Sequence, residues 1–358
     1  MPTDFSSPEL LPQREVLARK TPLAELVSKV GQLTCETFED DDPVSGHSRL
    51  RQIATYVKDC PTAIHPVELE LRITEPSVES RDSKKKILAQ TVGWTESPNE
   101  GAAREFHDHI AELNPEHTVI SISTEGISER CHNLPLAEAL HTSFKTMATN
   151  RLDFLEPIAE DAEVSLWGVS MGTVVGNEMA LQNLSAPRVE IVEVGHHDPA
   201  LVPPENVLQD MIIEFPGHVT YDIMRESALH PILAVRCMLG NSYSINPVRA
   251  LHRSITLTGN ALALMQGTPV EKIEAVVAGY PKVGVVAGGR DPLFQRNMWR
   301  ELQREHPDTL EILVDENAGH ASTINTPVAA TNMQTVFERL EKKQQTSKPR
   351  LYIVDDIS

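Results

Sequence analysis

The stretch "SLWGVSMGTVVG" at 165–176 places a serine between two glycines at the point where an apolar run ends. A strand that leads into a helix usually turns through Asn, Asp, Pro or Gly, with a polar side chain facing water. The pattern Gly168-x-Ser170-x-Gly172 therefore needs a more specific reason. Glycines on both sides permit a tight, strained elbow and a close approach of the helix to the strand. That geometry lifts the serine hydroxyl above the sheet.

A serine hydroxyl is a poor nucleophile unless a base removes its proton, so a reactive Ser170 requires a histidine and, behind it, a carboxylate. Asp291 follows the apolar run "VGVVAGG", and His320 lies in "VDENAGHAST" after the last expected strand. Two alternatives stay open for the acid: Asp198 in "GHHDP" can replace Asp291, and Asp291 can instead cap a helix that begins at Pro292. A histidine in an Asn-Ala-Gly loop is also compatible with a surface position.

The composition excludes several classes of protein. The chain has 358 residues, 40% of them hydrophobic, which suits one enlarged domain or two modest ones. Its 32 Lys and Arg against 51 Asp and Glu give a formal charge of -19, which opposes binding to nucleic acid and to anionic membrane surfaces. With no signal-peptide pattern and no apolar run of about 18 residues, we expect a cytoplasmic protein without membrane insertion.

The cysteines and clustered histidines give little support for a metal site. The four cysteines are far apart and form no C-x-x-C pair, so neither a zinc site nor a disulfide framework is indicated. They are Cys35, Cys60, Cys131 and Cys237. Two histidine groups, His196 with His197 and "HDH" at 107–109, suggest metal ligands at first sight. Neighbouring side chains diverge on regular elements, so we expect neither a metal nor a cofactor.

Strands alternating with helices occupy 63–198 and 276–340, which predicts an α/β fold with a mostly parallel central sheet and helices on both faces. The alternating segment 67–73 is expected to be an antiparallel edge strand with one wet face. Further strands are expected in the segments 86–94, 117–123, 162–170, 189–195, 282–291 and 310–320. Helices are expected around Phe106, Ile110 and Leu113, before residue 160, and after Ser170.

Three segments lie outside this alternation. Residues 1–62 are expected to form a partly disordered helical extension, with one helix starting at Thr21-Pro22, a solvated acidic loop at 39–43 and a short helix over 50–57. Residues 199–275 carry Leu- and Met-bearing helical stretches without a good strand, which favours a helical cap over one end of the sheet. Residues 341–358 are expected to be a solvated tail.

Three motifs in this order, "GVSMG", "GGRDPLF" and "NAGHAST", resemble the α/β-hydrolase superfamily in its branch with a helical cap, over about residues 66 to 340. The resemblance implies that Ser170 is the nucleophile, His320 the general base and then acid, and Asp291 the residue that orients the imidazole. It also implies an oxyanion hole from the backbone N–H groups of Met171 and Trp94. The family often has His-Gly in the second of these loops, where this chain has Val92-Gly93.

The resemblance also indicates a reaction. Serine at the elbow, where dehalogenases and epoxide hydrolases carry a carboxylate, favours hydrolysis of carboxylic esters through an acyl-enzyme. An acyltransferase or thioesterase with the same residues, and an inactive binding protein, remain alternatives. The expected partner is a small, partly apolar acyl substrate, and a homo-oligomer through the N-terminal extension or the cap stays open. Met211, Ile213 and Met265 belong to a set that suits either an acyl pocket or the cap's own core.

Overall fold

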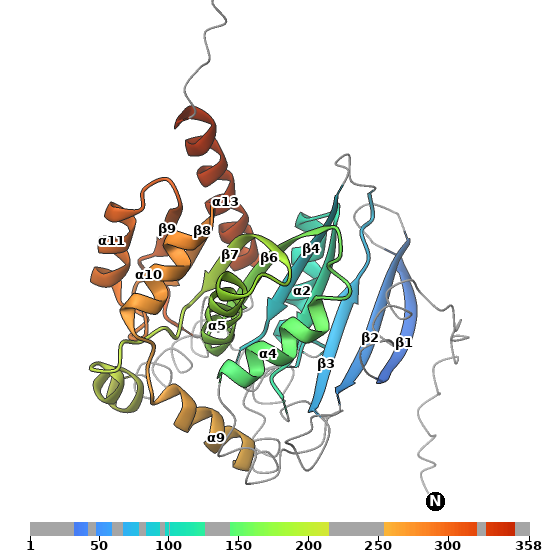
Figure 1. Cartoon of the computed structure of the whole chain (residues 1–358), viewed down its shortest axis with the longest axis horizontal. Coiled ribbons are helices and arrows are strands. Elements are labelled where there is room, and N and C mark those ends of the chain that lie inside the picture. Colours follow the sequence, from blue (N-terminus) through green and yellow to red (C-terminus); the bar gives the residue numbers. More distant parts are fainter. Residues whose placement is uncertain are drawn as a thin grey trace, which may run out of the picture.

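The computed structural model describes residues 32–41, 48–58, 67–78, 84–93, 97–99, 101–125, 144–214, 254–320 and 327–347. Nine strands of these residues form one sheet in the order β1-β2-β3-β5-β4-β6-β7-β8-β9 (Figure 1). The strands are β1 (Gln32–Asp41), β2 (Ser48–Lys58), β3 (Val67–Thr74), β4 (Lys85–Thr91), β5 (His117–Ile122), β6 (Ala162–Val169), β7 (Glu190–His197), β8 (Val283–Gly288) and β9 (Leu310–Asp315).

The strands from β5 to β9 in this order run parallel, whereas β1, β2 and β3 pair antiparallel with their neighbours. The central strands β6 and β8 are nearly continuous apolar runs and are almost fully buried. Such runs are typical of parallel strands covered on both faces, because neither face meets water. The predicted α/β class, with its mostly parallel sheet, is confirmed.

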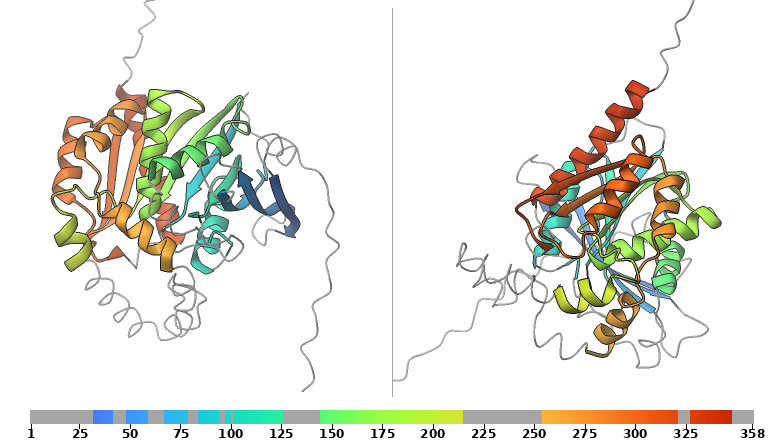
Figure 2. Two further views of the ribbon diagram at one scale, coloured as in Figure 1. Left: turned by 60° about the horizontal axis from the view of Figure 1, so that its bottom comes forward. Right: turned by 90° about the vertical axis from the view of Figure 1, so that its left-hand side faces the viewer.

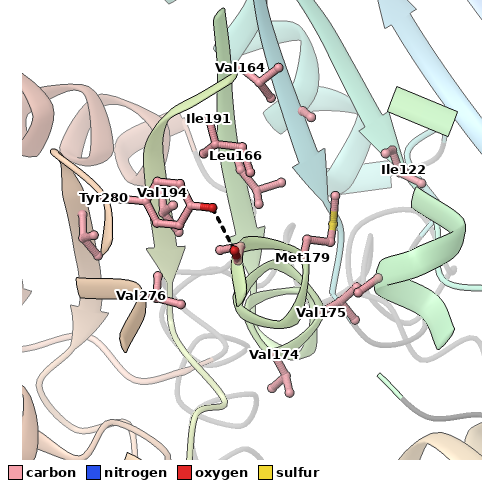
Figure 3. Close-up of a cluster of buried hydrophobic side chains, with 14 of the residues drawn as sticks. Ile122, Val164, Leu166, Val174, Val175, Met179, Ile191, Val194, Val276 and Tyr280 are labelled. Atoms are coloured by element: carbon pink, nitrogen blue, oxygen red, sulfur yellow. Dashed lines mark hydrogen bonds between the residues drawn. The ribbon is translucent and has the colours of Figure 1, made fainter. Parts of the chain in front are cut away.

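Helices cover both faces of the sheet (Figures 1 and 2). The helices α4 (Phe144–Leu155), α5 (Met171–Ser185), α10 (Val270–Gly279) and α11 (Arg296–Glu305) contribute to one core cluster. On the opposite face, α2 (Gly101–Leu113) and α13 (Pro327–Ser347) contribute to a second. Figure 3 shows α5 against the first face, where the Tyr280 hydroxyl donates a hydrogen bond of 2.8 Å to the Ala180 carbonyl oxygen. Within the described part, no helix has the length and apolar composition needed to cross a bilayer.

The N-terminal extension differs from its prediction. Residues 48–58 form strand β2 instead of a short helix, and the acidic run expected as a loop contributes to the end of β1. Both strands extend the main sheet, since β2 pairs with β3 along eight residue pairs from Arg51–Thr74 to Lys58–Val67. The spacing of Leu50, Ile53, Ala54 and Val57 fits a helical face, yet ladder bonds to β3 decide the outcome. The helix predicted after Thr21-Pro22 lies outside the described residues.

Strand β3 is antiparallel as predicted, but the prediction of an edge position with a wet face is wrong. It lies between β2 and β5, and its polar residues Glu70 and Arg72 are buried. Both charged side chains have partners there: Arg72 forms a forked ion pair with Asp108, and the Glu70 carboxylate accepts hydrogen bonds from Ser97 and Asn99. Alternation along the strand therefore reflects buried polar pairs instead of exposure to water.

The helical insertion and the C-terminal segment are described in part. Within 199–275 the structure describes the π-helix η1 (Leu208–Glu214), helix α9 (Ser254–Leu264) and the start of α10. Figure 1 places α9 below the carboxyl ends of the central strands, while the cap as a whole remains a prediction. Ile213 and Met265, two of the residues named for an acyl pocket or cap core, are exposed. The predicted tail beginning at 341 is wrong for 341–347, because α13 continues to Ser347.

Candidate active site

Each of four neighbouring parallel strands is followed by a candidate site residue identified in the sequence. Ser170 follows β6, Asp198 follows β7, Asp291 lies in the loop after β8, and His320 lies in the loop after β9. Because the carboxyl ends of parallel strands meet at one edge of a sheet, residues 150 positions apart in the chain lie side by side.

The turn at Ser170 has the strained backbone that the flanking glycines predict. Ser170 has φ 50° and ψ −121°, a region that side-chain-bearing residues rarely adopt. A Cβ on Gly172 would lie 2.2 Å from the Thr91 carbonyl oxygen, and one on Gly168 would lie 2.6 Å from the Gly172 carbonyl oxygen. Neither position tolerates a side chain, so β6, β4 and the start of α5 approach closely. The Ser170 N–H donates to the His197 carbonyl oxygen at 2.9 Å, which fixes the turn to β7.

A chain of two hydrogen bonds joins the serine, the histidine and the aspartate. Ser170 Oγ lies 2.9 Å from His320 Nε2, and His320 Nδ1 lies 2.7 Å from Asp291 Oδ2. Histidine and aspartate are almost fully buried, whereas the serine is partly accessible. In this arrangement Nδ1–H donates to the carboxylate and Nε2 accepts from the hydroxyl, which is the tautomer that proton removal from serine requires.

Asp291 uses its two oxygens for different partners. Oδ2 contacts His320, while Oδ1 accepts a hydrogen bond of 2.9 Å from the Leu293 N–H. The next helix, α11, begins at Arg296, so a helix starting at Pro292 does not form. The alternative of a helix cap is therefore wrong, although a local side-chain turn to Leu293 does hold the carboxylate in place.

The loops that carry Asp291 and His320 are fastened to one another. The Arg290 N–H donates to the Ala318 carbonyl oxygen at 3.0 Å. A Cβ on Gly288 would lie 2.7 Å from the same oxygen, so only glycine allows this approach. Two backbone loops held in this way keep the imidazole and the carboxylate in register.

Thr173 is a supporting residue that the sequence analysis did not identify. Its hydroxyl donates to the Ser170 carbonyl oxygen at 2.6 Å and accepts from the Ala200 N–H at 3.1 Å. The side chain is fully buried and links the elbow to the segment after β7. A threonine three residues after the serine, in the first turn of the helix, was the available signal.

The proposed oxyanion donors are described only in part. Met171 is the first residue of α5, so its N–H is one of the groups that the helix's own hydrogen bonds do not use. That position suits a donor beside Ser170 Oγ. Trp94, the other predicted donor, lies outside the described residues. The loop before it begins with Val92, whose N–H donates to the Ile122 carbonyl oxygen at 3.2 Å.

The histidine groups considered as metal ligands diverge. His107 bonds Thr74 and Ser121 inside the protein, whereas His109 contacts Glu112 near the surface. His196 tilts against Trp299, and His197 stacks on Phe106. The pairs point to different surroundings, as the geometry of regular elements predicts.

Burial keeps the two adjacent histidines of β7 neutral. Desolvation lowers the pKa of His196 from 6.5 to about 4. It also lowers the pKa of His197 to about 3, with a smaller contribution from the positive charge of His320. No ring nitrogen of either residue has a hydrogen-bond partner within the described part of the chain.

Among the residues that the structure describes, two groups of side chains have ligand atoms close enough to hold one cation between them. One oxygen of Asp198, one of Asp291 and one ring nitrogen of His320 lie within 4.8 Å of one another, as do ligand atoms of the partly exposed set Glu274, Glu305 and His306. In the buried group both His320 nitrogens already face protein partners, Ser170 and Asp291. The arrangement thus favours proton transfer over metal coordination.

Comparison with known proteins identifies the fold. No protein-family model matches the chain, and no curated protein matches it in sequence. Among solved structures, a thermophilic esterase from Thermogutta terrifontis shares 18% identity with a TM-score of 0.53, over 81% of this chain and 98% of that one. A carboxylesterase structure from Nitrososphaera gargenis shares 12% identity with a TM-score of 0.50, over 81% and 98%.

A third solved structure leads to the same fold. E-2-(acetamidomethylene)succinate hydrolase shares 14% identity with a TM-score of 0.50, over 80% of this chain and 99% of that one. All three matches span nearly the whole of the known chain and about four fifths of this one. The protein described here therefore has the α/β-hydrolase fold.

Proposed function

We propose that this protein hydrolyses carboxylic esters through an acyl-enzyme formed on Ser170. The observation that carries the proposal is the continuous hydrogen-bond chain from Ser170 Oγ through His320 to Asp291 at a strained elbow. The solved structures with the same fold include an esterase and carboxylesterases, which makes an ester the natural substrate class.

The proposed reaction has two halves. His320 Nε2 takes the proton of Ser170 Oγ as the oxygen attacks the ester carbonyl carbon, and Asp291 stabilises the imidazolium that forms. The oxyanion accepts hydrogen bonds from the Met171 N–H and, on the resemblance, from the Trp94 N–H. His320 then gives its proton to the leaving alkoxide. In the second half His320 takes a proton from a water molecule as the water oxygen attacks the acyl carbonyl carbon. The bond between that carbon and Ser170 Oγ then breaks, and His320 returns the proton to Ser170 Oγ, which frees the carboxylic acid and restores the serine hydroxyl.

The experiment pairs covalent labelling with turnover. A fluorophosphonate probe is added to the purified protein, the modified peptide is mapped by mass spectrometry, and hydrolysis of short p-nitrophenyl esters is measured in parallel. We expect the adduct on Ser170, and we expect both labelling and hydrolysis to be lost in Ser170→Ala and His320→Ala. Ser185→Ala is the matched control, because this exposed serine lies at the other end of α5.

The alternatives give different outcomes. An acyltransferase or thioesterase labels at Ser170 but passes the acyl group to an added alcohol, or prefers acyl-CoA to the ester. A binding protein with an inactive site shows no adduct although it is folded. Retention of ester hydrolysis in Ser170→Ala contradicts the proposal outright.

A further inference from the structure

A second buried carboxylate lies beside the histidine and aspartate of the candidate active site. Asp198 is 0% exposed, and one of its oxygens lies within 4.8 Å of both an Asp291 oxygen and a His320 ring nitrogen. Burying a carboxylate is expensive unless hydrogen bonds or a nearby cation compensate for lost hydration. A carboxylate in this position therefore needs a reason beyond filling space.

The backbone at Asp198 is strained in the same way as at the nucleophile. Asp198 has φ 44°, one of three residues other than glycine with positive φ in the described part of the chain, together with Ser170 and Asp161. Strain of this kind persists only where the surroundings hold the residue firmly, and it concentrates at functional sites. The Asp198 N–H donates to the Val286 carbonyl oxygen at 2.8 Å, which anchors the residue to β8.

The side chain of Asp198 also contacts the end of β8, directly before the loop that carries Asp291. Its Oδ1 accepts a hydrogen bond of 2.9 Å from the Gly288 N–H, three residues before Asp291. The second oxygen, Oδ2, lies 3.9 Å from His197 Nε2. Asp198 thus connects the end of β7 to the end of β8 and lies near the imidazole of His320.

From this geometry we infer that Asp198 is a second acid of the site, which positions the Asp291 loop through Gly288 and adds negative charge beside the imidazolium of His320. The inference rests on the proposed function, since an imidazolium forms only when Ser170 gives up its proton. Two carboxylates, those of Asp198 and Asp291, then stabilise the imidazolium, whereas a Ser-His-Asp triad uses a single aspartate for this. When the Asp291 carboxylate is removed, Asp198 still offers a carboxylate oxygen within 4.8 Å of a His320 ring nitrogen.

In the described part of the chain, the charged and titratable groups that face this position come from three elements. They are His197 and Asp198 from the end of β7, Asp291 from the loop after β8, and His320 from the loop after β9. His197 is neutral at neutral pH because burial lowers its pKa to about 3. Among the described residues around this position, Asp198 and Asp291 are the carboxylate groups placed to oppose a positive charge on His320.

The test compares Asp198→Asn, Asp291→Asn and the double variant. Asparagine keeps an oxygen that can accept a hydrogen bond from the Gly288 N–H but removes the charge. The variant therefore separates the effect of this hydrogen bond from the effect of the negative charge. Glu316→Gln is the matched control, because it removes one charge from an exposed position four residues before His320. Folding is checked by circular dichroism and thermal unfolding for each variant.

Two readouts are measured for every variant: kcat and KM for a p-nitrophenyl ester, and the rate of fluorophosphonate labelling of Ser170 against pH. For Asp198→Asn we expect kcat to fall about tenfold with KM unchanged, since one acid remains. We also expect the acidic limb of the profile of labelling rate against pH to shift to lower pH by about one unit, because loss of a negative charge near His320 makes protonation of its imidazole less favourable. Asp291→Asn should retain at least about ten times the activity of the double variant.

The outcomes separate this inference from the proposed function. Absence of labelling in the unmodified, folded protein overturns both. Normal labelling with Asp198→Asn indistinguishable from Glu316→Gln, and the double variant no worse than Asp291→Asn, overturns the role of Asp198 alone. If Asp198→Asn fails to fold, Asp198→Glu, which keeps the charge, must recover the pH profile, and its failure to do so counts against the inference.

Discussion

Gly172 lies so close to Thr91 that a methyl group on its Cα would sit 2.2 Å from the Thr91 carbonyl oxygen. This contact places the first turn of α5 against the end of β4 and thereby fixes the position of Ser170 relative to the sheet. Gly176, one turn further along the same helix, has nothing within 4 Å of the equivalent position. The two glycines therefore differ in whether the surrounding structure leaves room for a methyl group.

Gly172→Ala should displace the elbow, because the three nearest atoms that a new Cβ meets, the carbonyl oxygen and carbon of Thr91 and the carbonyl oxygen of Val92, all belong to the backbone. We expect ester hydrolysis to fall by roughly 10²-fold, since small misplacements at the reacting atom have effects of this size. Gly176→Ala should keep full activity and gain about 0.5–1 kcal/mol of stability as an alanine inside a helix. Urea unfolding and kcat/KM of the two variants check this. Equal activity of both would contradict the tight packing at Gly172.

Thr173→Val should weaken the elbow through a lost hydroxyl. The Ala200 N–H loses its acceptor and the Ser170 carbonyl oxygen loses a donor, at a cost of about 1–3 kcal/mol for the buried group left unpaired. Thr173→Ser keeps both hydrogen bonds and should retain most of the stability and activity. Thermal unfolding with kinetics of both variants is the measurement, and a serine variant as poor as the valine variant would show that the methyl group matters instead.

Arg151→Met should destabilise the protein strongly. The Arg151 guanidinium is fully buried and bonds the Glu125 carboxylate and the Ser123 carbonyl oxygen, so its removal leaves a buried anion unpaired, at about 3–5 kcal/mol. Adding Glu125→Gln removes that anion and should recover much of the loss. Chemical unfolding of single and double variants measures both effects.

The matched control for that pair lies on the surface. Lys84 and Glu190 also form an ion pair, but both are largely exposed. Lys84→Met should therefore leave the unfolding midpoint unchanged, since solvent screens such pairs. A loss comparable to that of Arg151→Met would mean that burial is not what makes the inner pair important.

His196 should make the protein sensitive to mild acid. Burial lowers its pKa from 6.5 to about 4. Between these two pH values His196 is therefore protonated in the unfolded chain but neutral in the folded chain. Stability falls as the pH decreases through this window, and at pH 5 this residue alone costs about 2 kcal/mol. His196→Phe should reduce the difference in unfolding free energy between pH 7 and pH 5 by that amount. An unchanged difference would show that His196 is hydrated or paired in solution.

The order of elements and the candidate site residues were predictable because their signals are local. Apolar runs such as "VGVVAGG" and the helix carrying Phe106 and Ile110 report burial within a few residues of sequence. The elbow is recognisable because glycines on both sides of a serine allow a strained turn that other residues do not. The order in which Ser170, Asp291 and His320 follow successive strands then limits where their side chains meet.

Strand pairing at the N-terminus was not predictable in the same way. Residues 50–57 carry apolar side chains at a spacing that fits a helix, and the decision for β2 comes from ladder bonds to β3, with which it pairs antiparallel. The same holds for Glu70 and Arg72, whose polarity predicted exposure although partners from other segments bury them. Non-local hydrogen bonds and ion pairs leave no periodic mark in the chain.

By itself, the sequence determined the α/β class, the strained turn at Ser170 and the two candidate acids, because each depends on a short pattern of apolar, glycine and acidic residues. Only the tertiary structure decided that Asp291 bonds His320 Nδ1 while Asp198 lies beside them both. That choice depends on ångström-scale placement of loops from three strands, held by contacts such as the one between Arg290 and Ala318. A one-dimensional pattern carries the order of these groups but not the distances between them.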